Sequence, residues 1–176
     1  MKRALIFGAA LMAAPVQADD LDGWRTAGRV GEVALVAAAL GKTIADGDRE
    51  GAGQFALGMG TTVGVTEVLK RAVGSERPNG RDDRSFPSGH TSISFSAAGY
   101  LHARHGWEWG APAIVAASFV GWSRVEAREH RWGDVFAGAL IGTASAHIFT
   151  TRYDDRVRLL PWGDTQGGGV AARMTF

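Results

Sequence analysis

The apolar residues of this chain gather in five long stretches that polar segments separate. From Asp19 onward these stretches are rich in alanine and longer than an ordinary strand, which favours helices over strands. We predict helices over residues 28–45, 53–73, 89–104, 110–126 and 131–150. The pattern therefore predicts an all-α fold, a compact helical bundle of about five to six helices.

Two segments depart from this pattern. Residues 74–87 are rich in proline, glycine, asparagine and acidic residues, which is typical of a loop. Near the C-terminus, residues 156–162 and 169–176 flank a glycine-rich turn with the sequence Gly-Asp-Thr-Gln-Gly-Gly-Gly. This arrangement favours a short C-terminal β-hairpin.

The first residues have the composition of a secretory signal peptide. Two basic residues precede an apolar run over residues 4–16, and a small residue, Ala18, follows shortly after. An uncleaved anchor helix is the alternative, but the run is short for a span of about 20 residues. We expect residues 1–18 to be cleaved on export to the periplasm and residues 19–176 to form a single domain.

Length and charge limit the classes of function. The chain has 176 residues, enough for one domain with a core. Without residues 1–18 it carries 17 basic and 18 acidic residues, so the formal charge moves from +1 to −1. No basic run stands out, and nucleic acid is therefore not expected as a partner. The chain has no cysteine, so packing and not disulfides must stabilise it.

The hydropathy of the expected mature chain leaves membrane association open. The longest stretches without charge or histidine, residues 51–66 and 109–123, contain 16 and 15 residues. Both are shorter than the roughly 18 to 20 residues of a clear transmembrane helix. A bundle at the membrane, or partly in it, and a soluble bundle are both compatible with this pattern.

A first candidate motif combines Lys70, at the end of a predicted helix, with Arg77 and Pro78 in the loop. Basic residues at a helix C-terminus also complement the helix dipole, so this pair alone indicates little.

A second motif, Pro87-Ser88-Gly89-His90, introduces a predicted helix. The free N–H groups of a helix N-terminus, with a glycine that lets the backbone come close, suit an anion. A capped helix with a partly exposed histidine explains the same residues equally well.

A third motif consists of Ser123-Arg124, five further residues, His130, three further residues and Asp134. If residues 130–134 are helical, His130 and Asp134 share a face one turn apart, and the carboxylate can orient the ring. A histidine nucleophile needs such an orienting group, although a surface pair at this spacing is common.

Together the motifs supply what phosphoryl transfer requires, namely cations, amide donors, a nucleophile and an acid. In order and spacing they resemble the motifs of the type-2 phosphatidic acid phosphatase and vanadium haloperoxidase superfamily. The pattern is matched at eleven positions: Lys70, Arg77, Pro78, Pro87, Ser88, Gly89, His90, Ser123, Arg124, His130 and Asp134. The resemblance covers residues 70–134 and implies a helical phosphatase.

The resemblance also implies a role for each residue. His130 attacks phosphorus and becomes phosphohistidine, Asp134 stabilises the charge on its ring, and His90 protonates the leaving oxygen. The phosphate is bound by the remaining motif residues, Lys70, Arg77, Ser88, Gly89 and Arg124. No metal and no cofactor are implied.

Other titratable residues have simpler explanations. A metal site made of His90, His130, Asp134 and either Asp82 or Asp83 is opposed by the three nearby cations. His102, His105 and His147 match no motif and are expected to be polar surface or core residues. Solvation or local pairing with Arg128 and Arg131 is expected for Glu126 and Glu129.

Two functions other than a phosphatase are alternatives for this sequence. The haloperoxidases of the superfamily hold vanadate on the equivalent histidine, but they are typically much larger than this chain. A non-catalytic protein that binds phospholipid or phosphate would not need His130 and Asp134. The motifs describe the phosphate pocket and not the attached group, so both a phosphorylated lipid, which the apolar helices favour, and a small phosphomonoester fit as substrates.

Overall fold

The computed structural model describes residues 21–153, 157–164 and 167–174. The predicted signal peptide, residues 1–18, lies outside these residues. The described part contains five helices: α1 (Leu21–Ala45), α2 (Arg49–Val73), α3 (Gly89–His105), α4 (Trp107–Glu126) and α5 (Trp132–Phe149). The predicted all-α helical bundle is confirmed.

α3 begins at Gly89 as expected from the sequence, but the starts of α1 and α2 differ from those expected. α1 begins at Leu21 and not at residue 28, and α2 begins at Arg49 and not at residue 53. The side chain of Asp48 caps α2, because its Oδ1 accepts a hydrogen bond from the backbone N–H of Gly51 at 2.9 Å. The cap allows α2 to begin in a polar stretch that apolar periodicity alone does not mark.

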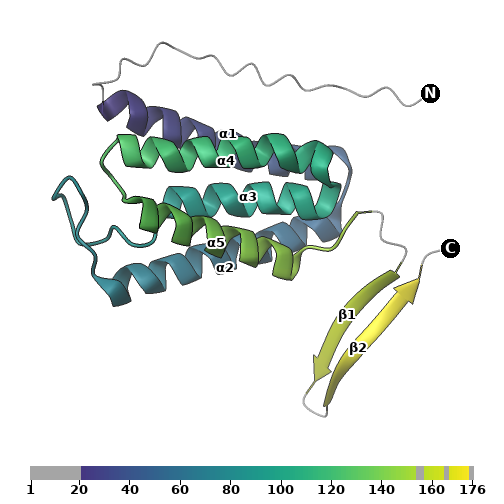
Figure 1. Ribbon diagram of the computed structural model, residues 1–176. Coiled ribbons are helices and arrows are strands. Elements are labelled where there is room, and N and C mark those ends of the chain that lie inside the picture. Colours follow the sequence, from purple (N-terminus) through teal and green to yellow (C-terminus); the bar gives the residue numbers. More distant parts are fainter. Residues whose placement is uncertain (1–20, 154–156, 165–166, 175–176) are drawn as a thin grey trace, which may run out of the picture.

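α3 is the central helix of the bundle and packs against the other four (Figure 1). Its contact with α5 is close because α5 presents glycines. A Cβ atom added at Gly138 would lie 2.6 Å from the backbone oxygen of Ser88, and one at Gly142 would clash with the backbone oxygen of Ser92. The start of α3 is thereby held against the first turns of α5.

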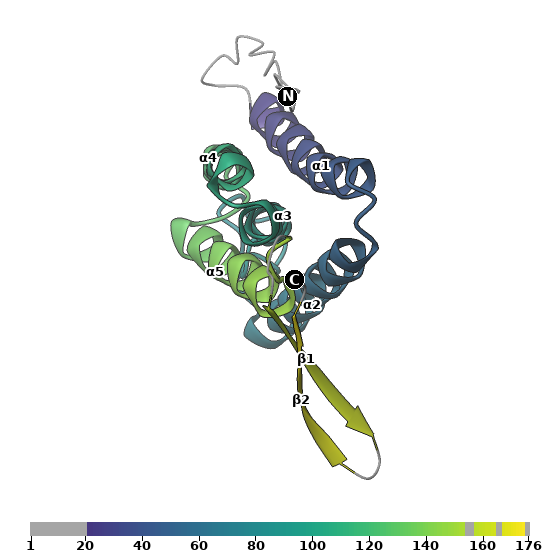
Figure 2. The same ribbon diagram turned by 90° about the vertical axis from the view of Figure 1, so that its right-hand side faces the viewer.

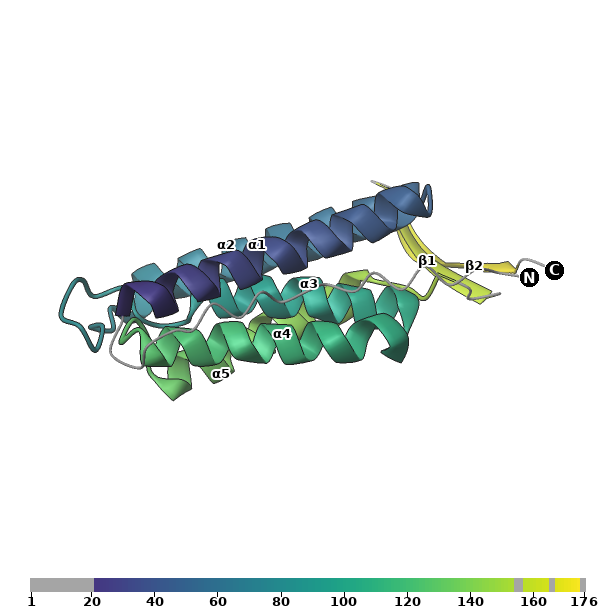
Figure 3. The same cartoon turned by 90° about the horizontal axis from the view of Figure 1, so that it is seen from above.

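The two N-terminal helices cover α3 from one side and diverge from each other (Figures 2 and 3). α1 packs mainly on α4 and α3, while α2 packs on α5 and α3. The core that these contacts bury contains many alanines, with Leu35, Phe55, Tyr100 and Leu101 as its larger side chains. Small side chains let the helices approach closely and so fix their positions.

The predicted C-terminal β-hairpin is present. β1 (Val157–Asp164) pairs antiparallel with β2 (Gly167–Met174), from Val157 opposite Met174 to Asp164 opposite Gly167. The hairpin projects from the end of the bundle at which α5 finishes (Figure 1).

Hydropathy gives no transmembrane helix in the described part of the chain: none of its helices combines the length and the apolar character that a membrane crossing needs. Large apolar side chains are nevertheless exposed on outer helix faces, among them Val30 and Ile44 on α1 and Phe136, Leu140 and Ile148 on α5.

Candidate active site

The three motifs meet at one end of the bundle, opposite the hairpin (Figure 1). α2 ends there, the loop of residues 74–88 leads into α3 there, and the connection between α4 and α5 crosses there. The predicted site residues lie as follows: Lys70 on α2, Arg77 in the loop, Ser88, Gly89 and His90 at the start of α3, Arg124 near the end of α4, His130 in the connection and Asp134 in the first turn of α5.

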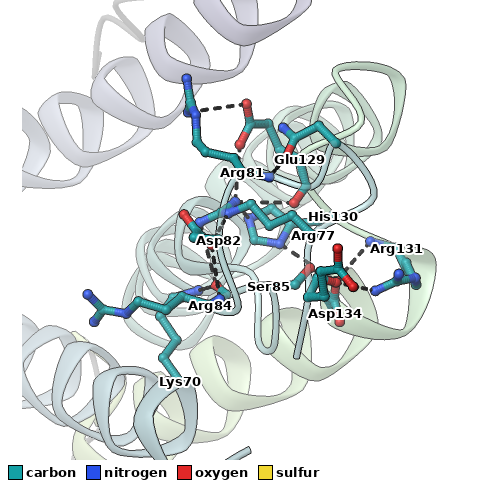
Figure 4. A network of polar contacts seen from close by, with 12 residues as sticks. Lys70, Arg77, Arg81, Asp82, Arg84, Ser85, Glu129, His130, Arg131 and Asp134 are labelled. Carbon is teal, nitrogen blue, oxygen red and sulfur yellow. Dashed lines mark hydrogen bonds and ion pairs between the residues drawn. The ribbon is translucent and has the colours of Figure 1, made fainter. Parts of the chain in front are cut away.

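His130 is buried between a cation and a carboxylate. Its Nε2 lies 3.3 Å from Nη1 of Arg77, and its Nδ1 lies 3.7 Å from Oδ2 of Asp134 (Figure 4). Burial lowers the pKa of His130 to about 3, and the charges of Arg77 and Lys70 act in the same direction. The ring is therefore neutral at physiological pH.

The helical geometry assumed for residues 130–134 is wrong. α5 begins only at Trp132, and Arg131 before it is extended, with φ −89° and ψ 162°. His130 belongs to the connection, where its backbone N–H donates to the carbonyl of Arg124 at 3.2 Å. His130 and Asp134 are neighbours because the connection folds back on the helix start and not because they share a helix face.

Asp134 is fixed by several hydrogen bonds. Its Oδ2 accepts from Oγ of Ser85 at 2.6 Å and from the backbone N–H of Arg131 at 2.8 Å. Its backbone oxygen accepts from the N–H of Ser88 at 3.0 Å. One residue thus ties α5 to the loop and to the start of α3. Ser85, fully buried in the loop, had no motif that could identify it in the sequence.

Lys70 is buried beneath the loop. Its Nζ donates to the backbone oxygens of Arg84, at 2.9 Å, and Pro87, at 2.6 Å. Burial lowers the pKa of Lys70 to about 8, with Arg77 acting in the same direction. The ammonium is therefore still charged at neutral pH, and it holds the loop against α3.

Arg124 is almost fully buried, and among the described residues its Nε and Nη2 have no hydrogen-bond partner. Burial lowers the pKa of Arg124, but a guanidinium stays protonated at any physiological pH. α1 covers it closely, since a Cβ at Gly28 would lie 3.3 Å from Cζ of Arg124. A buried cation with unpaired donors needs an anion nearby.

Arg77 is held by two acidic residues. Its Nε donates to Asp82 Oδ1 at 2.7 Å, and its Nη1 donates to Glu129 Oε2 at 3.1 Å. Glu129 is buried and also binds Arg25 of α1 at 2.7 Å. Burial raises the pKa of Glu129, but Arg25 and Arg77 outweigh it and the pKa lies below its ordinary value.

The expectation for Glu129 is therefore wrong. This side chain is buried and does not pair with Arg128 or Arg131. It instead orients Arg77 by accepting a hydrogen bond from its guanidinium. Glu126 is exposed, as expected, and accepts a hydrogen bond from Trp122 at 2.9 Å. Both Glu126 and Glu129 were visible in the sequence as acidic residues inside the third motif. Only the packing shows that Glu129 is buried and Glu126 is exposed.

Ser88 and Gly89 form the start of α3. Ser88 is fully buried, and its Oγ accepts from Oγ1 of Thr91 at 2.9 Å. A Cβ at Gly89 would lie 3.7 Å from Cε of Lys70, so the helix start and the lysine are in close proximity. The first backbone amides of α3 are thus beside a buried cation, as an anion site requires.

His90, one residue further, faces α1. Its Nε2 lies 3.5 Å from Oε2 of Glu32, a residue that the motifs did not include. Burial lowers the pKa of His90 to about 4, and Arg124 and Arg29 act in the same direction. Glu32 is a single acidic residue in an otherwise apolar part of α1. This isolated charge was the only feature of the sequence that could have marked Glu32 as a candidate site residue.

An apolar groove begins at Glu32 and runs between α1 and α2. Its volume is about 450 Å³, and Ile93 of α3, one turn after His90, contributes to its wall. The diverging helices that bound it are visible in Figure 2. The other lining residues are Val33, Val36, Ala37, Leu40, Met59 and Val63.

The remaining described histidines lie at the opposite end of the bundle. Nδ1 of His102 is 3.3 Å from Nε2 of His147, and Nδ1 of His105 is 3.7 Å from Asp46 Oδ2. Over the described ranges, no cluster of three or more His, Asp or Glu residues is arranged to hold a metal ion.

A helical bundle that brings a histidine, an aspartate and three cations to one end agrees with the resemblance seen in the motifs. Residues 79–158 match the model of the PAP2 superfamily, so this part of the chain is similar to that superfamily. The resemblance seen in the motifs is thus confirmed. The matched segment contains the second and third motifs, while Lys70, Arg77 and Pro78 precede it.

Named relatives agree with this family. The chain is 37% identical over 117 residues to "Lipid A 4'-phosphatase" of Helicobacter pylori, covering 60% of this chain and 59% of that protein. It is 36% identical over 91 residues to "Lipid A 1-phosphatase" of Porphyromonas gingivalis, covering 49% and 20%. The chain thus spans less than two thirds of the length of these relatives.

The fold is also similar to a solved structure, titled "Crystal structure of Aquifex aeolicus LpxE". The TM-score is 0.63 at 24% identity, and the similarity covers 73% of this chain and 83% of that chain. This likeness confirms the fold.

Proposed function

We propose that this chain is a phosphatase that hydrolyses the phosphate monoester of a lipid through a phosphohistidine on His130. The observation that carries the proposal is the buried, neutral ring of His130 between Arg77 and Asp134, next to the unpaired donors of Arg124. The proposal also has the support of the relatives, whose names describe lipid A phosphatases.

Binding depends on the cations. The two guanidinium groups of Arg77 and Arg124 and the ammonium of Lys70 offset the charge of the phosphate, and Arg124 has buried donors for its oxygens. Ser88 and the amide of Gly89 complete the cradle at the positive end of α3. These groups supply the charge stabilisation that a metal supplies in other phosphatases, so no metal is required.

The geometry supports Nε2 of His130 as the attacking atom. Asp134 lies on the Nδ1 side of His130 and favours the proton there, which leaves the lone pair on Nε2, the nitrogen that faces Arg77. Nε2 attacks phosphorus, the bond between phosphorus and the ester oxygen breaks, and His90 donates a proton to that oxygen. Water then attacks the phosphohistidine and gives a proton to His90, and inorganic phosphate leaves.

The groove favours a lipid as the leaving group. It starts beside His90, the residue proposed to protonate the leaving oxygen, and its remaining lining is apolar. An acyl chain placed there is removed from water at about 25 cal/mol per Å² of buried surface. A small soluble phosphomonoester would leave the groove unused.

We further propose that the protein acts in the periplasm, after cleavage of residues 1–18, and that residues 19–176 are one domain. The apolar side chains exposed on α1 and α5 favour association with the membrane that holds the lipid. Separation of cell fractions, with and without a carbonate wash, measures both the compartment and the strength of attachment.

The test of the reaction is phosphate release from para-nitrophenyl phosphate and phosphatidic acid in the presence of EDTA, with His130→Ala beside the wild type. Release that survives EDTA, disappears in the variant and is faster for phosphatidic acid supports a metal-independent lipid phosphatase that requires His130. An acid-labile phosphoenzyme on His130 after a rapid quench supports the intermediate. Equal release by the variant would refute the role of His130.

A further inference from the structure

Glu32 is a partly buried carboxyl group to which the proposed reaction assigns no role. It lies on α1, its side chain is 17% exposed, and its Oε2 is 3.5 Å from Nε2 of His90 on α3. The same residue lines the apolar groove. It is therefore close both to His90, the group proposed to protonate the leaving oxygen, and to the groove proposed to hold the leaving group.

The charged groups around this pair come from several segments. The cations that act on both side chains are Arg29 of α1 and Arg124 of α4. Arg77 of the loop and Glu129 of the connection act on His90 as well. The groove residues that α2 contributes, Met59 and Val63, are apolar.

These surroundings place the proton of the pair on the carboxyl group. Burial raises the pKa of Glu32 to about 7, although Arg124 and Arg29 oppose this, while the pKa of His90 is about 4. Near neutral pH, Glu32 of the free pocket is thus about half protonated, while His90 is neutral. A neutral histidine cannot protonate a leaving group, so His90 needs a source of a proton.

We propose that Glu32 is a positioning residue that acts through His90 and stores the proton that His90 delivers to the leaving oxygen. This inference rests on the proposed phosphatase reaction. Burial and nearby cations keep His90 neutral, and the dianionic phosphate, bound to Arg77 and Arg124, offsets the cations. The proton then moves from Oε2 of Glu32 to Nε2 of His90, which leaves a carboxylate beside an imidazolium.

The proton balance closes over one turnover. The imidazolium of His90 gives one proton to the departing alkoxide and becomes neutral, and Glu32 remains a carboxylate. In the second half, the attacking water gives one proton to His90, which returns it to Glu32. The pair ends as it began, and the net reaction is ester plus water to alcohol plus phosphate.

The experiment compares two leaving groups in Glu32→Gln, which keeps the shape of the side chain but cannot exchange the proton. An alkyl phosphate needs its alkoxide protonated, whereas para-nitrophenolate leaves readily without help. We expect the variant to lose about tenfold or more in kcat on the alkyl phosphate at neutral pH and to lose little on para-nitrophenyl phosphate. The loss on the alkyl phosphate should shrink as the pH falls towards the pKa of His90, because solvent can then protonate the ring.

Glu126→Gln is the matched control, an exposed glutamate at the same end of the bundle. It should leave kcat unchanged on both substrates. Circular dichroism should show wild-type helix content in both variants. Equal losses on both substrates at every pH would show a merely structural role and overturn the proposal, as would no loss at all. Failure of the phosphatase proposal has a different signature, since the wild type would then release phosphate from neither substrate.

Discussion

At the scale of single residues, the candidate site depends on polar groups whose environments are unlike water. Burial makes His130 neutral and keeps Glu32 partly protonated near neutral pH, while the buried Glu129 stays ionised because Arg25 and Arg77 surround it. These differences give similar side chains different roles. Each of them can be tested by a substitution that changes one group.

The buried ammonium of Lys70 should set the alkaline limit of activity. Its pKa is lowered to about 8, so it is protonated below that pH and loses its charge above it. We expect kcat/KM for para-nitrophenyl phosphate, which needs little acid assistance, to fall as the pH rises through about 8. Lys70→Arg keeps the charge and should move the fall to higher pH, while the exposed neighbour Arg71→Lys should not. A profile that is identical in all three proteins would rule out Lys70 as the titrating group.

Ser85 should matter although no motif contains it. Its hydroxyl donates to the carboxylate of Asp134 at 2.6 Å in a buried position. Loss of a hydrogen bond to a charged group costs about 1.5–3 kcal/mol, so Ser85→Ala should lower the free energy of unfolding by that amount. It should also lower kcat, because Asp134 loses its orientation. The exposed Ser118→Ala is the control, and equal effects of the two substitutions would contradict the prediction.

At the scale of elements, the contact between α3 and α5 positions the site. Two backbones come close where Gly138 faces the start of α3, and Asp134 and Ser88 are hydrogen-bonded one turn away. α1 performs a similar role through Gly28, which leaves room for Ser123 and Arg124. The small residues of these helices therefore determine how accurately the site is assembled.

Two glycine substitutions should have opposite effects. Gly138→Ala places a Cβ 2.6 Å from the oxygen of Ser88 and should destabilise the fold by about 1–3 kcal/mol, with a loss of activity. Gly60→Ala on α2, where a Cβ meets nothing within 4 Å, should stabilise it by up to about 1 kcal/mol without changing activity. Thermal unfolding and phosphate release measure both effects. Stabilisation by Gly138→Ala would show that α3 and α5 are not in tight contact.

At the scale of the whole molecule, the bundle separates two environments that meet at His90. One end holds the buried cations, and the groove between α1 and α2 offers an apolar surface that leads away from them. A lipid phosphate has the same division between a charged group and apolar chains. The arrangement of the helices thus matches the proposed substrate as a whole.

Filling the groove should discriminate between substrates. Val63 lines it and Val65 does not, and the two valines are 42% and 40% exposed on the same helix. Val63→Trp should raise KM for phosphatidic acid about tenfold, the equivalent of roughly 1.4 kcal/mol of lost binding free energy. KM for para-nitrophenyl phosphate should stay unchanged. Val65→Trp should affect neither. If both variants bind phosphatidic acid like the wild type, the acyl chain lies elsewhere.

The sequence by itself determined the class of the fold and the residues of the candidate site. Five helices follow from long apolar, alanine-rich stretches, and the loop and hairpin follow from proline and glycine, because these signals act between residues close in the chain. The motifs identified eight candidate site residues, and the structure brings all of them to one end of the bundle. Only the tertiary structure decided that His130 precedes its helix, that Ser85, Glu129 and Glu32 contact motif residues, and that a groove begins beside His90. These features depend on the packing of segments far apart in the chain, which local sequence patterns do not encode.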